Sequence, residues 1–186
     1  MPSPEYPHPT DDIPPEFMGP FGVPKLPWLV ASAKNMILPD AGISLVWQRS
    51  EGFTEEEVAR RAGQARRSFF TSQTELYGLI GAAGAAHAMR ILIEAEQVVI
   101  EPESPGSPDL LNTHEKEALE FISRGYSVAQ AAALMQAATG LLVTRDAVKH
   151  LLHSSYAKLE ARSRPQYVRR AYETKVLERM AYPDRT

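Results

Sequence analysis

The sequence predicts a mostly α protein, and three observations favour this fold class. Apolar residues recur with helical spacing along most of the chain, and no stretch of convincing length alternates apolar and polar residues as a strand would. Residues that cap helices precede several of these periodic stretches. The chain has 186 residues, 44% of them hydrophobic, which suits one ordinary domain or two small ones.

The first 27 residues are expected to form a Pro-rich extended arm. Nine of the 15 prolines lie there, and proline fixes φ and lacks an N–H, which disfavours helix and central strand. This composition is typical of a disordered tail. The alternative is an arm that docks on another protein through its large apolar side chains, which are Phe17, Phe21, Leu26 and Trp28.

Residues 28–100 are predicted to form a helical domain that mediates dimerisation or binds a partner. Its first two helices cover residues 29–37 and 41–50. They are separate because Pro39 interrupts the apolar pattern, and Asp40 is suited to cap the second helix.

Two further helices are expected in this domain. Thr54, followed three residues later by Glu57, has the spacing of a capping box, and Gly63 is suited to end the helix that follows. One long helix is then predicted from about Ser72 to Val99, because its alanine-rich centre favours helix despite three glycines.

Residues 101–110 are predicted to be a linker, since they hold three prolines and a glycine. The charge balance changes sign nearby. Residues 1–107 carry 8 basic and 14 acidic side chains, and residues 108–186 carry 12 basic and 9 acidic ones, so the overall net charge of −3 divides into −6 and +3. The basic half is therefore suited to a polyanion.

Residues 111–175 are predicted to form four short helices, followed by a tail at 176–186. The expected helix starts are, in order, Asn112 or Thr113, Ser127, Thr144 and Pro165. The third helix has an apolar stripe on one side and basic residues on the other, and residues 143–179 carry 9 basic and 4 acidic side chains. An exposed basic helix is suited to the major groove of DNA.

Two stretches of this region resemble the LuxR/NarL-type (GerE-like) helix-turn-helix family. LNTHEKEALEFISRGYS is similar to the family's opening helix and turn, and VTRDAVKHLLHSSYAKLEARSRPQYV to its recognition and closing helices. The most specific match is KL-x-x-RSR-x-Q-x-V, from Lys158 to Val168. The resemblance covers about residues 111–172. It implies a C-terminal four-helix LuxR-type helix-turn-helix that binds double-stranded DNA, usually as a dimer.

The resemblance also implies which residues face DNA. The recognition positions fall on Thr144, Arg145, Val148 and Lys149, and His150 is expected to add a contact. Arg162 and Arg164 also match family positions, where each either contacts DNA or joins an internal ion pair.

The chain departs from the family pattern at two places in this region. Glu160 stands where the family has a glycine. The stretch LMQAATGLLVT, residues 134–144, is about six residues longer than the usual link, and either extends the second helix or enlarges the turn.

The stretch TEEEVARRAGQARRSFF, residues 54–70, faintly resembles the DNA-binding end of TetR-like regulators. It offers a possible second DNA or partner surface at Arg60, Arg61, Arg66 and Arg67. The alternative is an ordinary helical pair whose arginines are solvated.

Several classes are excluded or not expected. The chain has no Cys, which excludes disulfides, zinc–thiolate sites and cysteine nucleophiles. His150 and His153 have a spacing compatible with a metal, but no Cys or carboxylate pair accompanies them, so we expect no metal. Without a phosphate loop or a catalytic triad, we expect no enzyme and no cofactor. The absence of a long apolar run or a signal peptide predicts a cytoplasmic protein without membrane contact.

The sequence therefore favours a bacterial DNA-binding transcription regulator whose arm contacts RNA polymerase or another regulator. The family resemblance implies that this regulator is a dimer. The alternative is a protein-binding adaptor or anti-activator that docks on RNA polymerase or another regulator, which the long link and Glu160 favour.

Overall fold

The structure is a computed structural model that describes residues 13–63, 66–103 and 107–180, apart from the side chains of residues 66 and 67. Within these ranges the chain forms α-helices, two short 3₁₀ helices and no β-sheet beyond one bridge between Met18 and Pro24. The predicted mostly α class is confirmed. The α-helices are α1 Leu26–Lys34, α2 Asp40–Ser50, α3 Glu55–Arg61, α4 Arg66–Ile80, α5 Ala85–Glu94, α6 Thr113–Ser123, α7 Val128–Thr139, α8 Arg145–Lys158 and α9 Arg164–Glu173.

Most of the expected helix starts are confirmed. Capping boxes begin α3, α6 and α7, where Thr54, Asn112 and Ser127 each accept a hydrogen bond from the backbone three residues on. Thr144 caps α8 in the same way through its side chain. The expected cap at Asp40 is wrong, because α2 already begins at that residue and Pro39 precedes it without a side-chain bond.

The prediction of one long helix from Ser72 to Val99 is wrong. The chain breaks between α4 and α5, and the two helices are bent by 55°. Gly81 lies in the break with φ of 65°, a left-handed conformation that favours glycine over other residues. The bend turns α5 into the centre of the protein, where every residue from Ala86 to Glu94 is buried.

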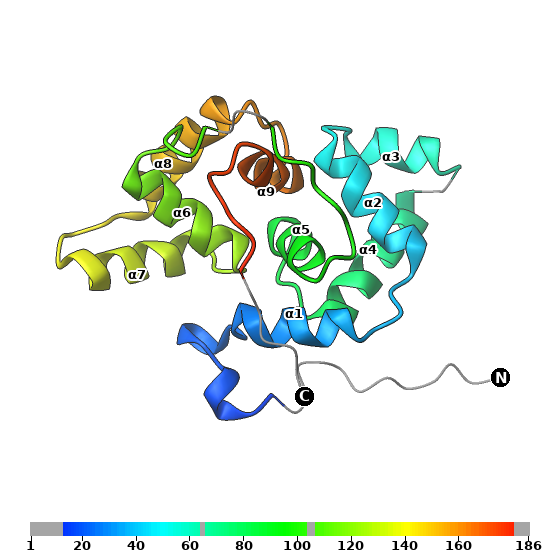
Figure 1. Ribbon diagram of the computed structural model, residues 1–186, viewed down its shortest axis with the longest axis horizontal. Helices are drawn as coiled ribbons and strands as arrows, with labels where there is room; N and C mark the ends of the chain where they lie inside the picture. The colour runs from blue at the N-terminus through cyan, green and yellow to red at the C-terminus, as the bar shows by residue number, and fades with distance from the viewer. Residues whose placement is uncertain (1–12, 64–65, 104–106, 181–186) are drawn as a thin grey trace.

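The hydrophobic core is built around α5 and α9, which lie side by side in the middle of the molecule (Figure 1). Helices α2, α3 and α4 lie on one side of this pair, and α6, α7 and α8 lie on the other. One apolar cluster contains residues from α1, α2, α4, α5 and α9, including the fully buried Leu29, Leu76, Ile91 and Val168. A smaller cluster holds α6, α7 and α8 together around Ala118, Ala131, Ala132, Met135 and Val148.

The main core therefore crosses the linker expected at residues 101–110. Helix α9, which the resemblance assigns to the C-terminal domain, packs on α5 and α2 of the N-terminal one. The guanidinium of Arg169 lies 4.6 Å from the centre of the Trp47 ring, and the Ser163 hydroxyl donates to the carbonyl of Arg49 at 2.7 Å. The two predicted domains thus share one core.

A buried polar network joins α5, α6 and α9. The Arg90 side chain is 1% exposed and donates to Glu120 and to the hydroxyl of Ser123, both on α6. The Tyr172 hydroxyl of α9 donates to Glu94 of α5. Because a buried charge is costly without a partner, these bonds help to hold α6 in a defined position against the main core.

The described part of the Pro-rich arm is more ordered than expected. Two 3₁₀ helices form at Pro15–Phe17 and Pro20–Gly22, and Leu26 is buried in the core as the first residue of α1. The Phe17 ring lies 4.7 Å from the Trp28 ring, whereas Phe21 is 57% exposed. Leu26 therefore cannot serve as a docking anchor, because its burial already stabilises the fold. Residues 1–12 of the arm lie outside the described residues.

None of the described helices is by itself long and apolar enough to cross a membrane. Only the bent pair Ser68–Ile80 and Ala85–Glu94, taken together, reaches the required length and composition.

Candidate nucleic-acid interface

The helix that the resemblance identifies as the recognition helix is α8. Its inner face packs on α6 and α7, and its position is fixed further by polar contacts. Glu115 of α6 accepts hydrogen bonds from Ser154 and Lys158 of α8 at 2.6 and 2.7 Å. Ser155 of α8 and Tyr167 of α9 share a hydrogen bond of 2.6 Å. These contacts hold α8 against α6 on one side and against α9 on the other.

Glu115 is suited to this role because it stays ionised. Burial on its own raises the pKa of this carboxyl, but hydrogen bonds from Lys158, Ser154 and the backbone of Asn112 outweigh burial and lower the pKa below its usual value. A charged Glu115 accepts stronger hydrogen bonds than a neutral one.

The outer face of α8 carries most of the predicted DNA-facing residues. Thr144, Arg145, Lys149 and His150 are all exposed. Arg145 forms no ion pair within the described residues. Lys149 pairs with Asp146 at 2.9 Å, but both side chains are more than 60% exposed, at 66% and 78%, so the pair is weak and a phosphate could replace the carboxylate.

Val148 does not belong to this face. Its side chain is fully buried in the cluster that joins α6, α7 and α8, so the expectation that it faces DNA is wrong. A helix turns about 100° per residue, which carries Val148 to the inner face while its neighbours on both sides, Ala147 and Lys149, stay exposed.

Arg162 and Arg164 lie in the turn before α9 and at its first residue. Both are exposed, and neither joins an ion pair with any described residue, so the alternative of an internal ion pair finds no partner there. Arg164 borders a cleft that Lys149 also borders, whereas Arg162 lies beside a different hollow formed with Gly52 and Gln166.

The count of nine basic and four acidic side chains in residues 143–179 overstates the positive charge that is available to a ligand. Lys158 pairs with Glu115, and Arg169 and Arg170 both pair with Glu173. Arg170 also pairs with Glu103, from the expected linker. The spacing of Arg169 and Glu173 on one helix could have been recognised in the sequence, but the partners of Lys158 and the contact with Glu103 depend on the tertiary fold.

The structure gives a physical account of the two departures from the family pattern. Glu160 has φ of 53°, so this side chain occupies a left-handed position of the kind that glycine favours. The long link, residues 134–144, forms the second half of α7, a left-handed C-cap at Gly140 and a connection over residues 140–144. That connection exposes Leu141 and Leu142, at 69% and 83%.

The second candidate surface lies on α3 and the start of α4, on the other side of α5 and α9 from most of α8 (Figure 1). Glu57 of α3 and Tyr156 and Ala157 of the last turn of α8 nevertheless border the same hollow as Arg162. Arg60 and Arg61 are exposed on α3, and the Arg61 guanidinium lies 3.5 Å from the centre of the Phe53 ring. Arg66 and Arg67 begin α4, and their side chains lie outside the described part of the structure.

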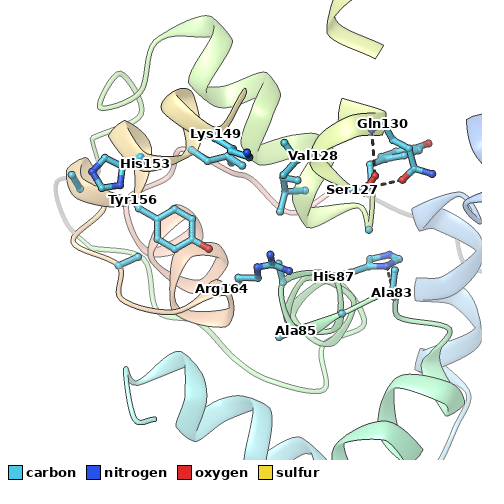
Figure 2. Close-up of a pocket in the computed structure, with 18 residues that line it drawn as sticks. Ala83, Ala85, His87, Ser127, Val128, Gln130, Lys149, His153, Tyr156 and Arg164 are labelled. Atoms are coloured by element: carbon cyan, nitrogen blue, oxygen red, sulfur yellow. Dashed lines mark hydrogen bonds between the residues drawn. The ribbon is translucent and has the colours of Figure 1, made fainter. Parts of the chain in front are cut away.

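A cleft of about 970 Å³ lies beside α8, and the sequence did not indicate it. Its walls come from the starts of α5, α7 and α9 and from one side of α8 (Figure 2). The cleft brings Lys149 and Arg164 together with His153 and with a buried histidine, His87. No sequence signal marked His87, because it sits inside an alanine-rich apolar helix.

Among the described residues, no group of three or more His, Asp or Glu side chains could hold a metal ion. No protein-family model, curated protein or solved structure matches this chain. The LuxR-type resemblance therefore depends on the sequence motifs alone.

Proposed function

We propose that this protein is a DNA-binding transcription regulator that places α8 in the major groove. The observation that carries the proposal is the division of α8 into two faces. Val148 and the residues around it pack on α6 and α7, while Arg145, Lys149 and His150 stay exposed. A helix fits the major groove, where cations neutralise phosphates or bind guanine.

The start of α8 supports the same proposal. Thr144 caps the helix, so its first turn is well formed without a ligand. Backbone N–H groups at a helix N-terminus attract a phosphate, and Arg145 lies at the first position of that turn. We therefore assign Arg145 and Lys149 as the principal DNA contacts, with Thr144 and His150 beside them.

The regulator is proposed to act as a homodimer, since the family pattern binds two half-sites. Two copies of α8 would then lie one helical turn of DNA apart, about 34–36 Å. Light scattering with and without a duplex tests this part of the proposal.

The central experiment is fluorescence anisotropy with a labelled duplex at several salt concentrations. Arg145→Ala and Lys149→Ala should each weaken binding, and Lys149→Ala should reduce the salt slope by about one, as expected when one phosphate contact is lost. Lys34→Ala is the matched control, because Lys34 is a cation on the distant α1 that pairs with Glu96. Wild-type binding by both α8 variants would contradict the assignment.

A second candidate function is a protein-binding adaptor that docks on RNA polymerase or another regulator. The exposed Leu141 and Leu142 favour it, because two neighbouring apolar side chains at the tip of the α7–α8 connection are suited to a protein partner. An adaptor would bind purified RNA polymerase, and the Leu142→Ser variant would lose this binding. The adaptor would bind no DNA duplex even at low salt.

A further inference from the structure

The cleft beside α8 has an unusual distribution of charge. Lys149, His153 and Arg164 line it, and no carboxylate is among its described lining residues. Figure 2 shows Arg164 near Ala85 at the start of α5, with Lys149 and His153 on the helix across the cleft. Lys149 pairs with the exposed Asp146, which does not border the cleft, whereas Arg164 forms no ion pair with any described residue. A space bordered by these two cations and by no carboxylate favours an anionic ligand.

The first turn of α5 adds to this preference. α5 has ten residues, and its N-cap residue is Gly84, which provides no side chain to accept the N–H groups of that turn. The start of α7 is different, because Ser127 and Gln130 already form a capping box there. The N-terminus of α5 therefore presents the positive end of a helix dipole to the cleft without a protein group to neutralise it.

His87 provides a second and independent indication of a ligand. Its side chain is 1% exposed, and its ring lies in the cleft wall between Ala83 and the start of α7 (Figure 2). Its Nδ1 accepts a hydrogen bond from the backbone N–H of Ala83 at 3.2 Å. Burial, and then the charge of Arg90, lower the pKa of His87 to about 3, so the ring is neutral.

A neutral ring that accepts at Nδ1 carries its proton on Nε2. That Nε2–H is buried and has no hydrogen-bond partner among the described residues. A buried donor without an acceptor is destabilising, so native proteins rarely leave one unpaired. An acceptor atom from a ligand would satisfy this donor once the side chains that cover Nε2 move aside.

The remaining walls define what else the ligand carries. Val128, Leu152, Tyr156 and Ala157 provide an apolar and aromatic surface. The volume of about 970 Å³ lies within the range of small-molecule sites, about 300–1,000 Å³. The cleft thus fits a molecule with an anionic end and an apolar or planar body.

We propose that this cleft binds a phosphorylated small molecule, with its phosphoryl group at the start of α5 between Arg164 and the His87 Nε2–H. Arginine and a helix N-terminus are both well suited to a multiply charged phosphoryl group. Lys149 and Tyr156 then face the rest of the ligand.

The position of the cleft gives the ligand a regulatory consequence. Lys149 borders the cleft and is also a proposed DNA contact, and Arg164 borders the cleft at a position where the family resemblance implies a DNA contact or an internal ion pair. A ligand that occupies these two cations therefore competes with DNA. This consequence rests on the proposed function, whereas binding of the ligand itself does not.

The test uses inorganic pyrophosphate as the probe and isothermal titration calorimetry on the full chain. Ala85→Glu places a carboxylate at the first position of α5, where an acid is compatible with the helix. We expect this variant to weaken pyrophosphate binding by at least about tenfold. Ala85→Gln, of similar size and without charge, should bind within about threefold of the wild type.

A second pair of variants keeps the test decisive if Ala85→Glu folds poorly. Arg164→Gln removes a cation that borders the cleft and should weaken pyrophosphate binding about tenfold. Lys34→Gln removes a cation of α1 that does not border the cleft, and should leave the affinity within about twofold. No binding by the wild type, or equal affinity in all variants, would overturn the proposal.

DNA binding of the same proteins identifies the source of the phosphate. If Ala85→Glu loses pyrophosphate but still binds the duplex, the cleft is a small-molecule site, and pyrophosphate should displace DNA from the wild type alone. If Ala85→Glu loses both ligands equally, the cleft holds a DNA phosphate and the small-molecule proposal fails. A wild type that binds pyrophosphate but no duplex contradicts the proposed function and leaves the cleft site supported.

Discussion

His87 shows how one buried side chain connects packing with chemistry. Gly125 lies against its ring, and a Cβ at that position would come within 2.4 Å of Nδ1. The glycine, which also has φ of 91°, therefore allows the ring to sit between α5 and the turn before α7. The same close packing removes water from the ring and keeps it neutral.

The pH dependence of stability follows from this burial. The pKa of His87 is about 3 in the folded protein and near the ordinary value of 6.5 in the unfolded chain, so the unfolded state binds the extra proton as the pH falls. The contribution of His87 to the free energy of unfolding is complete above pH 6.5 and declines as the pH falls from 6.5 to 3. Within this range the free energy of unfolding falls by up to about 1.4 kcal/mol per pH unit.

Urea unfolding at pH 7, 6 and 5 measures this effect against a matched variant. His87→Gln should flatten the decline over this range, because the titrating group is gone. His150→Gln changes an exposed histidine on α8 and should keep the wild-type decline. Parallel curves for the wild type and His87→Gln would show that His87 is not buried as described.

At the scale of elements, the break between α4 and α5 decides how the core is built. A continuous helix would carry the residues of α5 away from α1, α2 and α9, which they contact. The left-handed φ of Gly81 permits the bend, and Gly84 then adopts an extended conformation before α5 begins.

The two glycines should therefore respond differently to substitution. Gly81→Ala forces an L side chain into the left-handed region and should reduce the free energy of unfolding by about 1–2 kcal/mol. Gly84→Ser meets no atom within 4 Å and gives α5 a capping hydroxyl, so its stability should be unchanged or slightly higher. Chemical denaturation compares the two, and equal effects would argue against a strained turn at Gly81.

At the scale of the whole molecule, α9 joins the two halves of the chain. Its buried residues Tyr167, Val168, Ala171 and Tyr172 belong to the core that α5 centres. The expected linker also contacts α9, since the N–H groups of Glu103 and Ser107 donate to the carbonyls of Glu173 and Thr174. Helices α6, α7 and α8 share a small cluster of their own, and Leu119 of α6 also belongs to the main core.

A fragment of residues 108–186 should consequently not fold as an independent domain. Without α5 and α2 it would expose the buried face of α9, and Glu120 would lose Arg90. Circular dichroism and amide NMR spectra of the fragment should show little stable structure, and the full chain should unfold in one transition. A well-dispersed spectrum of the fragment would instead support two separate domains.

Local sequence patterns predicted much of the secondary structure and part of the candidate site. Capping residues and their partners lie three positions apart, so Thr54, Asn112, Ser127 and Thr144 could be recognised without any tertiary information. The basic outer side of α8 follows from helical spacing for the same reason. Val148 follows the apolar stripe of α8 and not the family motif, because its side chain is buried against α6 and α7.

The sequence by itself thus determined the helical class, most helix starts and the exposed cations of α8, because these depend on residues within about one turn of one another. Only the tertiary structure decided that α9 joins both halves in one core, that Lys158 pairs with Glu115 and that Arg170 pairs with Glu103. It alone placed His87, the uncapped start of α5 and Arg164 around one cleft. These features depend on contacts between residues far apart in the chain, which no local pattern encodes.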